Sequence, residues 1–486
     1  MLQRMIDKYK SLSPILKASF FFVLCGVMKD AVDILTTPIF TRLLSQDEYG
    51  LFSVYNSYYQ VLRIVVSLYI FGDGFNVGMA RYSDDSEAFT SATQGFATTL
   101  FLFWSVVFFV GRRWLIQLTQ MDCLLLWIML LQTLFSTSMN SWQQKKKYFY
   151  DYQIVSIVVI SYLILQPLLG IILIRLNPGQ WNNGRLRIYA GVGVQIFWGF
   201  ILYVVQFIHK PVFFNKTYWL FTLRTNVPIL PHYLSQIILN HADRLMIDRF
   251  VGKRETAIYT IGHAAAFTLF AFTSNVNSTF VPWLYRALKT QRAKEIHRVV
   301  ILLLLLCAFP AFVLVLIAPE AIAILGGTNY VDSIWVVPPL VFGVFLTFIY
   351  SIFADIELYY EKTKYVLISS LVGTVSNIML NLVFIPKYGF YAAGYTTVAG
   401  FFLMTLIHYF FLSKTCNANQ IQILEMIPLP MICFITVGLA ILSGLAMLLY
   451  PFAVVRYFLM VLATVIIVLQ KNRLVEIYKR LKNEEE

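Results

Sequence analysis

Residues 14–56 read PILKASFFFVLCGVMKDAVDILTTPIFTRLLSQDEYGLFSVYN, and their first 30 or so residues form an apolar stretch long enough to cross a bilayer. Lys29, Asp30 and Asp33 lie near the middle of this stretch. Each Lys, Arg or Asp at the centre of a membrane helix costs roughly 2.5–3.5 kcal/mol on insertion scales. At about 100° per residue, Asp30, Asp33 and Thr37 share one helix face. We therefore expect this face to turn towards protein or a water-filled cavity rather than lipid.

Two interpretations of these charges remain open. Lys29 and Asp33 are four residues apart, so they can neutralise each other and allow a core helix to pack. Alternatively, the charged face lines a cavity that meets a charged cargo or a coupling ion. The second interpretation is favoured because ionisable residues inside membranes usually have a function.

The composition places the chain among polytopic α-helical membrane proteins. Of 486 residues, 59% are hydrophobic and 13% are charged, and the mean hydropathy is +0.70. Soluble domains carry about 25% charged residues, and the alternating segments of an outer-membrane barrel are absent. The net charge of +13 favours contact of cytoplasmic loops with anionic membrane lipids, and no nucleic-acid partner is expected. The five cysteines form no CxxC pair, so no metal site is expected.

Apolar segments of about 20 residues recur along the chain, and the breaks between them are too short for a soluble domain. The predicted fold is an all-α polytopic membrane protein with about 14 transmembrane helices. The expected spans are 14–42, 49–73, 88–111, 121–142, 150–175, 187–208, 219–249, 255–284, 298–318, 332–356, 364–386, 389–412, 424–448 and 452–470.

The distribution of Lys and Arg predicts the orientation. With the N-terminus inside, the inner breaks hold roughly 23 basic residues and the outer breaks roughly 11, and cytoplasmic loops carry such an excess. We expect a multi-pass protein of the bacterial inner membrane with both termini cytoplasmic.

The sequence also contains a weak internal repeat. Residues 42–56 align without gaps with residues 249–263, so that Arg42 matches Arg249 and Glu48 matches Glu255. An even number of spans per copy gives both copies the same orientation, related by an axis along the membrane normal, with the cargo site between them. The predicted organisation is an N-terminal lobe at 1–210 (helices 1–6), a C-terminal lobe at 211–418 (helices 7–12), and helices 13–14 with a cytoplasmic tail at 419–486.

The stretch TPIFTRLLSQDEYGLFSVYNS at 37–57 resembles a segment typical of bacterial polysaccharide repeat-unit (O-antigen type) flippases. These belong to the multidrug/oligosaccharidyl-lipid/polysaccharide exporter superfamily, and the resemblance extends to chain length, twin six-helix lobes and two trailing helices. It implies a non-enzymatic flippase that moves undecaprenyl-diphosphate-linked oligosaccharide to the periplasmic leaflet by alternating access, for O-antigen or capsule synthesis. Lys29 and Asp30 resemble the Arg-Asp pair on the first helix of the lipid II branch.

Such a cargo carries an anionic pyrophosphate and a polar glycan, so its route requires buried cations and hydrogen-bonding groups. The span 219–249 supplies one polar stripe, and Pro228 and Pro231 are expected to bend it. The candidate substrate-binding residues are Lys29, Asn56, Tyr59, Arg63, Arg224, His232, Gln236, Asn240 and Arg244.

The energy source is predicted to be an ion gradient, the membrane potential or downhill use of the cargo, because no P-loop is present. Carboxylates can exchange a proton or hold Na⁺, and the candidates are Asp30, Asp33 and Asp243. Asn240 is expected to supply another oxygen to an ion held at Asp243. In the competing interpretation, these acids only neutralise Lys29 and Arg244.

Two alternative functions remain open. One is an ion-coupled exporter of drugs or other amphiphiles from the same superfamily. The other is a membrane-embedded polysaccharide polymerase or ligase, although the outer breaks offer no catalytic cluster. Expected partners are a lipid-linked oligosaccharide, membrane lipids and polysaccharide polymerase machinery, with no catalytic residue or cofactor. The cluster of Glu357, Glu361, Lys362 and Lys364 is interpreted as a solvated ion-pair network.

Overall fold

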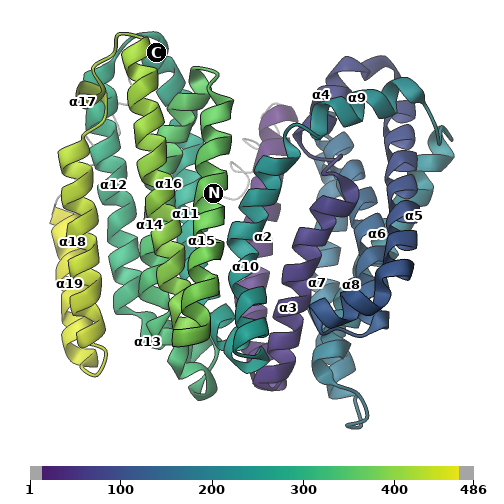
Figure 1. Ribbon diagram of the computed structural model, residues 1–486, viewed down its shortest axis with the longest axis horizontal. Helices are drawn as coiled ribbons and strands as arrows, with labels where there is room; N and C mark the ends of the chain where they lie inside the picture. The colour runs from purple at the N-terminus through teal and green to yellow at the C-terminus, as the bar shows by residue number, and fades with distance from the viewer. Residues whose placement is uncertain (1–13, 470–486) are drawn as a thin grey trace, which may run out of the picture. The chain divides into compact units, whose positions relative to one another are not determined.

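Helices make up the regular structure of residues 14–469, which are the residues that the computed structural model describes (Figure 1). None of these residues lies in a β-strand. Helices cover most of every expected span, and ten helices in this part of the chain are long and apolar enough to cross a membrane. The predicted fold class is therefore confirmed, while the number of fourteen spans stays a prediction. The predicted cytoplasmic tail and the basic N-terminus lie outside the described residues.

The helices group into two compact units. Unit 1 holds the described residues up to Thr260 together with Ile378–Phe390, and unit 2 holds Ile261–Asn377 and the described residues from Tyr391 onwards. The predicted lobe boundaries at residues 210 and 418 stay a prediction.

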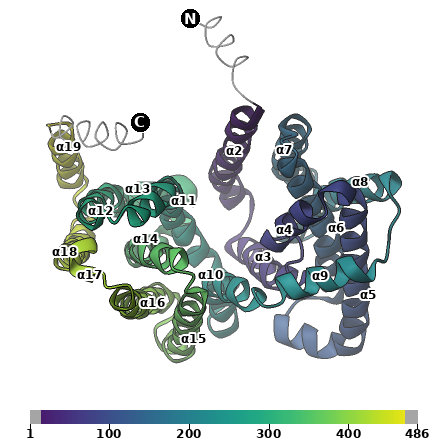
Figure 2. The same ribbon diagram turned by 90° about the horizontal axis from the view of Figure 1, so that it is seen from above.

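Unit 1 is built from long helices and two short ones. The long helices are α2 (Pro14–Leu43), α3 (Gln46–Ser67), α5 (Ser86–Thr119), α6 (Cys123–Tyr148), α7 (Tyr152–Arg175), α8 (Asn183–His209), α10 (Leu230–Phe250) and the start of α11 (Lys253–Lys289). The short elements are α4 (Asp73–Arg81), the 3₁₀ turn η1 (Ser83–Asp85) and α9 (Lys216–Asn226). Helices α4 and α9 pack together across one end of the long helices of this unit (Figures 1 and 2).

Unit 2 contains the rest of α11 and is centred on one buried helix. Its other elements are α12 (Ala293–Leu316), α13 (Ala318–Leu325), η2 (Thr328–Trp335), α14 (Val337–Tyr359), the part of α15 (Thr363–Tyr388) up to Asn377, α16 (Phe390–Ala418) from Tyr391, α17 (Ile423–Met426), α18 (Leu429–Leu448) and α19 (Ala453–Leu469). The rest of α15, from Ile378 onwards, belongs to unit 1. In α14, 83% of the most apolar window is buried, more than in any other candidate span. A polar side chain on α14 therefore has little chance of reaching lipid.

The prediction of one bent span over residues 219–249 is wrong. The structure has two helices, because α9 ends at Asn226 and α10 begins at Leu230. Proline has no backbone N–H and restricts the residue before it, so Pro228 and Pro231 end one helix and begin the next instead of bending a continuous one.

The family-like stretch at 37–57 acts as a structural joint. Ser45 and Glu48 form a capping box at the start of α3: Glu48 N donates to Ser45 Oγ (3.3 Å), and Ser45 N donates to Glu48 Oε2 (3.0 Å). The other oxygen of Glu48, Oε1, accepts a hydrogen bond from Asn183 N at 2.8 Å. One carboxylate therefore fixes the starts of both α3 and α8.

The two copies of the internal repeat meet at equivalent residues. Ser53 Oγ and Thr260 Oγ1 lie 2.6 Å apart and are separated by 207 positions. This separation is the shift of the repeat, so Ser53 and Thr260 are matched positions. A contact between matched positions is compatible with a pseudo-two-fold relation between the copies, which stays a prediction.

Replacing Gly50 with alanine is expected to loosen this joint. A Cβ atom at Gly50 would lie 2.0 Å from the Lys253 carbonyl oxygen, whereas one at the exposed Gly193 would meet nothing within 4 Å. Overpacking of this kind costs about 1–3 kcal/mol. Thermal unfolding in detergent should show a lower transition temperature for Gly50→Ala and little change for the control Gly193→Ala. Equal transitions for the two variants would contradict the close approach.

Candidate functional site

The polar residues of α10 form the best-defined cluster of candidate residues in unit 1. This helix packs along α3. It buries Asp243 and Arg244, whose exposed fractions are 4% and 8%. Two adjacent buried charges in a membrane helix are costly unless they are paired or hydrogen-bonded. Their partners therefore decide what this cluster can do.

Asp243 accepts two short hydrogen bonds from other helices. The hydroxyl of Tyr259 on α11 donates to Oδ2, and the amide of Asn381 on α15 donates to Oδ1, both at 2.6 Å. Tyr259 and Asn381 are themselves fully buried. The carboxylate thus ties three helices together in a dry environment.

Asn240 makes no hydrogen bond to Asp243 among the described contacts, and its predicted role as an oxygen ligand for an ion at Asp243 stays a prediction. The Asn240 side-chain amide instead donates to the Gln236 carbonyl oxygen of its own helix, at 2.8 Å. The side-chain amide that donates to Asp243 is that of Asn381. Sequence spacing on one helix could suggest Asn240 but could not locate an amide 138 positions away.

Arg244 belongs to a cluster of basic groups between α3 and α10. Its Nη1 donates to the Asn240 carbonyl oxygen (3.0 Å) and to His241 Nδ1 (3.4 Å). Arg63 on α3 is half-buried, and both arginines lie within electrostatic range of His241. The buried Nε of Arg63 has no hydrogen-bond partner among the described residues. The structure thus brings together two predicted cations, Arg63 and Arg244.

The charged residues of the first span are more exposed than the interpretation as a neutralised core helix requires. Lys29, Asp30 and Asp33 are all exposed on α2, and no Lys29–Asp33 ion pair within 4 Å is present among the residues described. Asp33 lines a cavity of about 70 Å³ that is enclosed by α2, α3, α7 and α8. A water molecule needs roughly 10–15 Å³ by a comparable measure, so the cavity has room for several. This placement agrees with the interpretation of a cavity lining.

Arg187 on α8 lines the same cavity and was not among the predicted site residues. Its guanidinium carbon lies 3.8 Å from the ring centre of Phe40 and 3.6 Å from that of Phe52, so the planar group is held by cation–π contacts. In the sequence, Arg187 falls at the edge of a span and resembles a loop cation. Its aromatic neighbours on α2 and α3 are the signal, and they become visible only in three dimensions.

The other predicted substrate residues lie on α3, α9 and α10. Tyr59 is buried in the core of unit 1, where its hydroxyl accepts a hydrogen bond from Gln195 Nε2 at 3.3 Å. Arg224 is exposed on α9, while Asn56 on α3 and His232 and Gln236 on α10 are half-buried. Their roles in cargo binding stay predictions.

The interpretation of Glu357 as part of a solvated network is wrong. Glu361, Lys362 and Lys364 are exposed, but Glu357 is fully buried on α14 and contacts His408 of α16. The helical period of the sequence indicates that Glu357 is buried, because Glu357 follows Ile349 and Phe353 at intervals of four residues, and all three are buried.

Sequence comparisons identify related proteins. Residues 15–288 match the family described as polysaccharide biosynthesis protein, and residues 228–383 match the MatE family. An Lsg locus protein of Haemophilus influenzae is 21% identical over 372 residues, which cover 74% of this chain and 89% of that protein.

Solved structures show the same fold at low sequence identity. The lipid II flippase MurJ in an inward closed conformation aligns with a TM-score of 0.67 and 13% identity, covering 94% of this chain and all of that one. An inward-facing multidrug resistance MATE family transporter of the MOP superfamily aligns with a TM-score of 0.56 and 12% identity, covering 80% of this chain and 95% of that one.

Proposed function

This chain belongs to the polysaccharide biosynthesis protein family, and we propose on that premise that it is a flippase for lipid-linked oligosaccharides. It would move undecaprenyl-diphosphate-linked repeat units from the cytoplasmic to the periplasmic leaflet of the bacterial inner membrane, for O-antigen or capsule. Alternating access between two lobes would carry the cargo. The fold shared with a lipid II flippase and a MATE transporter supports this proposal.

The observation that carries the proposal is the basic cluster of Arg63, His241 and Arg244. Arg244 is buried and Arg63 is half-buried, and charges in such places are costly unless they are paired. An anionic pyrophosphate is a ligand that would offset this cost. Arginine presents planar donors that match phosphate oxygens. The Arg63 Nε without a hydrogen-bond partner among the described residues is one such donor.

Ion coupling at the buried carboxylates forms a second part of the proposal. Moving one charge across about 100 mV supplies about 2.3 kcal/mol, which shifts an equilibrium more than tenfold. Asp243 is the preferred site for Na⁺ or H⁺, because it is buried and the hydroxyl oxygen of Tyr259 lies 2.6 Å from its Oδ2. Asp30 and Asp33 are the candidates on α2.

The alternative transport function is an ion-coupled drug exporter, and Asp33 beside the cavity favours it. The Asp33 carboxylate would suit a cationic amphiphile, although the Arg187 guanidinium lines the same cavity. Arg63 and Arg244 instead suit an anionic cargo. Extrusion of a cationic dye from cells that overproduce the protein would support this alternative. A membrane-embedded polymerase or ligase has no feature in the described residues that favours it.

Removing the cations should slow flipping of a fluorescent polyprenyl-diphosphate-linked oligosaccharide in proteoliposomes. A lost charged hydrogen bond is worth about 1.5–3 kcal/mol, so Arg63→Ala and Arg244→Ala are each expected to lower the rate about tenfold to hundredfold. Lys29→Ala should also lower the rate, and Arg63→Lys and Arg244→Lys should lower it less than the alanine variants.

The matched control is Arg113→Ala, which removes an exposed arginine of α5. Its flipping rate should equal that of the wild type. Surface polysaccharide on cells with equal protein levels provides a second readout. Wild-type flipping by the Lys29, Arg63 and Arg244 alanine variants would exclude these cations from the mechanism.

A further inference from the structure

Glu357 and His408 form a buried pair in unit 2 that the transport proposal does not use. Both side chains have no exposed surface, and Glu357 Oε2 lies 3.0 Å from His408 Nδ1. The outer atoms, Glu357 Oε1 and His408 Nε2, are buried and have no hydrogen-bond partner among the residues described. A buried polar atom without a partner costs about 1–3 kcal/mol, so this arrangement needs an explanation.

The charge state of the pair follows from its surroundings. If Glu357 is ionised and His408 is neutral, the pair carries a net charge of −1 in the core of a membrane unit, where an isolated charge is strongly disfavoured. One additional proton makes the pair neutral overall, whether it resides on the imidazole or on the carboxyl group. Glu357 also lies in the last turn of α14, where the negative end of the helix dipole disfavours a carboxylate.

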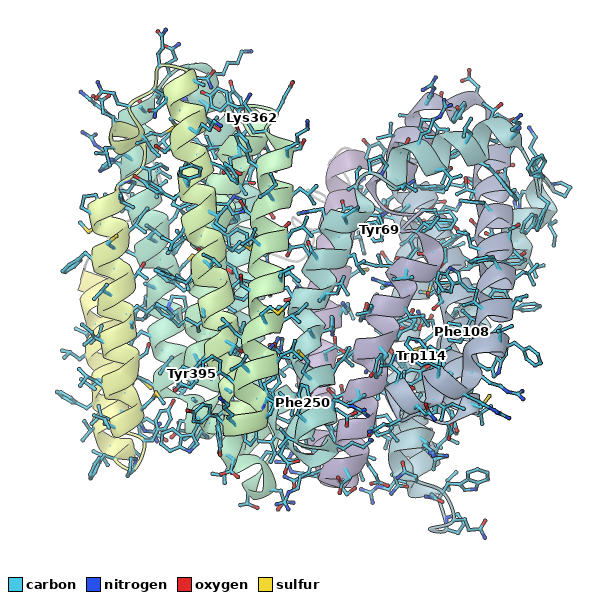
Figure 3. The ribbon with its side chains drawn as sticks, in the orientation of Figure 1. Tyr69, Phe108, Trp114, Phe250, Lys362 and Tyr395 are labelled. Atoms are coloured by element: carbon cyan, nitrogen blue, oxygen red, sulfur yellow. The ribbon has the colours of Figure 1, made fainter. Side chains whose placement is uncertain are left out.

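Within residues 14–469, no other charged side chain is hydrogen-bonded or ion-paired to Glu357 or His408. The ring of Tyr350 on α14 lies parallel to the His408 imidazole at 5.5 Å, and the carboxylate of Asp355 is turned to Asn277 of α11, which donates to it at 2.9 Å. Tyr409 of α16 packs against Phe353 of α14, and Cys416 on α16 and Cys433 on α18 lie within electrostatic range of Tyr409. The basic residues Lys362, Lys364 and Lys414 are exposed. Lys362 lies at one end of the unit 2 helices, at the top in Figure 3.

We propose that Glu357 and His408 form a proton-binding site of unit 2, separate from Asp243. While the pair is buried it holds one extra proton, and a conformational change that opens it to water releases that proton. In the imidazolium form, His408 Nε2 gives its proton to a water molecule, while Nδ1–H continues to donate to the Glu357 carboxylate. No other bond changes and no electron is transferred.

The site gives the proposed flippase a second proton carrier, and to that extent its role in transport rests on the proposed function. The exposed loop of Glu361 and Lys362 follows α14 directly. Only a short movement at this end of α14 would therefore expose the pair to water. Protons would bind in one conformation and leave in the other, as coupling requires.

The test counts protons released when the full chain is unfolded by detergent in a weakly buffered solution at about pH 8. In the unfolded chain at this pH, histidine is neutral and glutamate is ionised. The wild type should therefore release about one proton more than Glu357→Gln, because only the folded wild-type pair holds the extra proton. Glu361→Gln, which changes an exposed acid four residues away, should release as many protons as the wild type.

A second variant keeps the test decisive if Glu357→Gln fails to fold. Replacing both partners of a buried pair with apolar residues is often neutral or stabilising, so Glu357→Leu/His408→Leu is expected to fold and to release one proton fewer than the wild type. If Glu357→Gln and the double leucine variant release as many protons as the wild type, the proposal is overturned, whatever the transport assay gives.

The transport arm separates this inference from the proposed function. Flipping of the fluorescent polyprenyl-diphosphate-linked oligosaccharide should respond to an imposed pH gradient in the wild type and lose that response in Glu357→Gln. A wild type that releases the extra proton but does not flip the probe would contradict the flippase proposal and leave the proton site intact. A Glu357→Gln variant that still responds like the wild type would overturn the coupling role of the pair.

Discussion

Replacing Asp243 with alanine is expected to prevent most of the protein from folding. The change leaves the Tyr259 hydroxyl and the Asn381 amide, both fully buried, without their acceptor. It also removes the neighbouring carboxylate that compensates the charge of the buried Arg244 guanidinium. Breaking a buried charged network on one side costs about 3–5 kcal/mol, a large part of the 5–15 kcal/mol that stabilises a typical domain. The yield of monodisperse protein after detergent extraction and its thermal transition measure this loss.

The asparagine variant separates folding from coupling. Asn has the size of Asp and can still accept the Asn381 hydrogen bond through Oδ1, while its amide can donate to the Tyr259 oxygen. Asp243→Asn should therefore fold nearly normally but flip the labelled oligosaccharide at a rate that no longer depends on an imposed Na⁺ or H⁺ gradient. Asp47→Asn, on the exposed first turn of α3, is the control. If Asp243→Asn responds to gradients like the wild type, Asp243 is a structural counter-ion.

The long helices and the joint between them could be predicted from the sequence because their signals are local. Hydrophobic segments identify the spans. The similarity between residues 42–56 and 249–263 is present in the sequence and makes Ser53 and Thr260 matched positions, and the structure places these two side chains in contact. The number of helices between residues 219 and 249 was misjudged because hydropathy extends across the break at Pro228. The missing N–H of proline decides that break, and averaged hydropathy does not record it.

The partners of the candidate site could not be predicted, because they depend on tertiary packing. Asp243 was identified from its position in an apolar span, yet its hydrogen-bond donors lie 16 and 138 positions away. Arg187 resembled a loop cation until Phe40 and Phe52 were found around it. Glu357 was assigned to solvent by its charged sequence neighbours, although the four-residue period of α14 places it on the buried face.

The two trailing helices, which have no counterpart in the repeat, raise a different question, namely what holds them to unit 2. Helix α18 packs against α12 and α14. Arg456 on α19 makes a bidentate pair with Glu320 of α13, with both N···O distances at 2.7 Å, and its Nη1 also donates to the Leu316 carbonyl oxygen. The Tyr457 hydroxyl donates to Glu320 Oε1 at 2.8 Å. Bidentate arginine–carboxylate pairs are the strongest of the ordinary ion pairs.

Replacing Arg456 with alanine should therefore detach the start of α19 from α13. Arg456 is 2% exposed, and removing one partner of a buried pair costs about 3–5 kcal/mol, with the lower end applying here because Glu320 is partly exposed. Hydrogen exchange should accelerate across Ala453–Leu469 and remain unchanged in unit 1. Unchanged exchange in α19 would show that packing against neighbouring helices such as α12 holds the trailing helices without the Arg456–Glu320 pair.

Acidification should produce the same detachment without a mutation. The hydrogen bonds from Arg456 hold the pKa of Glu320 below its ordinary value of 4.5. Because the folded pKa is depressed, the stabilisation is fully present above the unfolded value and is lost as the pH falls through the folded one. The protection of α19 amides from hydrogen exchange, relative to the intrinsic exchange rate at each pH, should therefore fall in the wild type on acidification below about pH 4. Glu320→Gln should exchange rapidly at every pH, and the exposed-acid control Glu425→Gln should behave like the wild type. An equal acid response in the wild type and Glu320→Gln would assign the pH dependence to another carboxylate and remove Glu320 as the anchor.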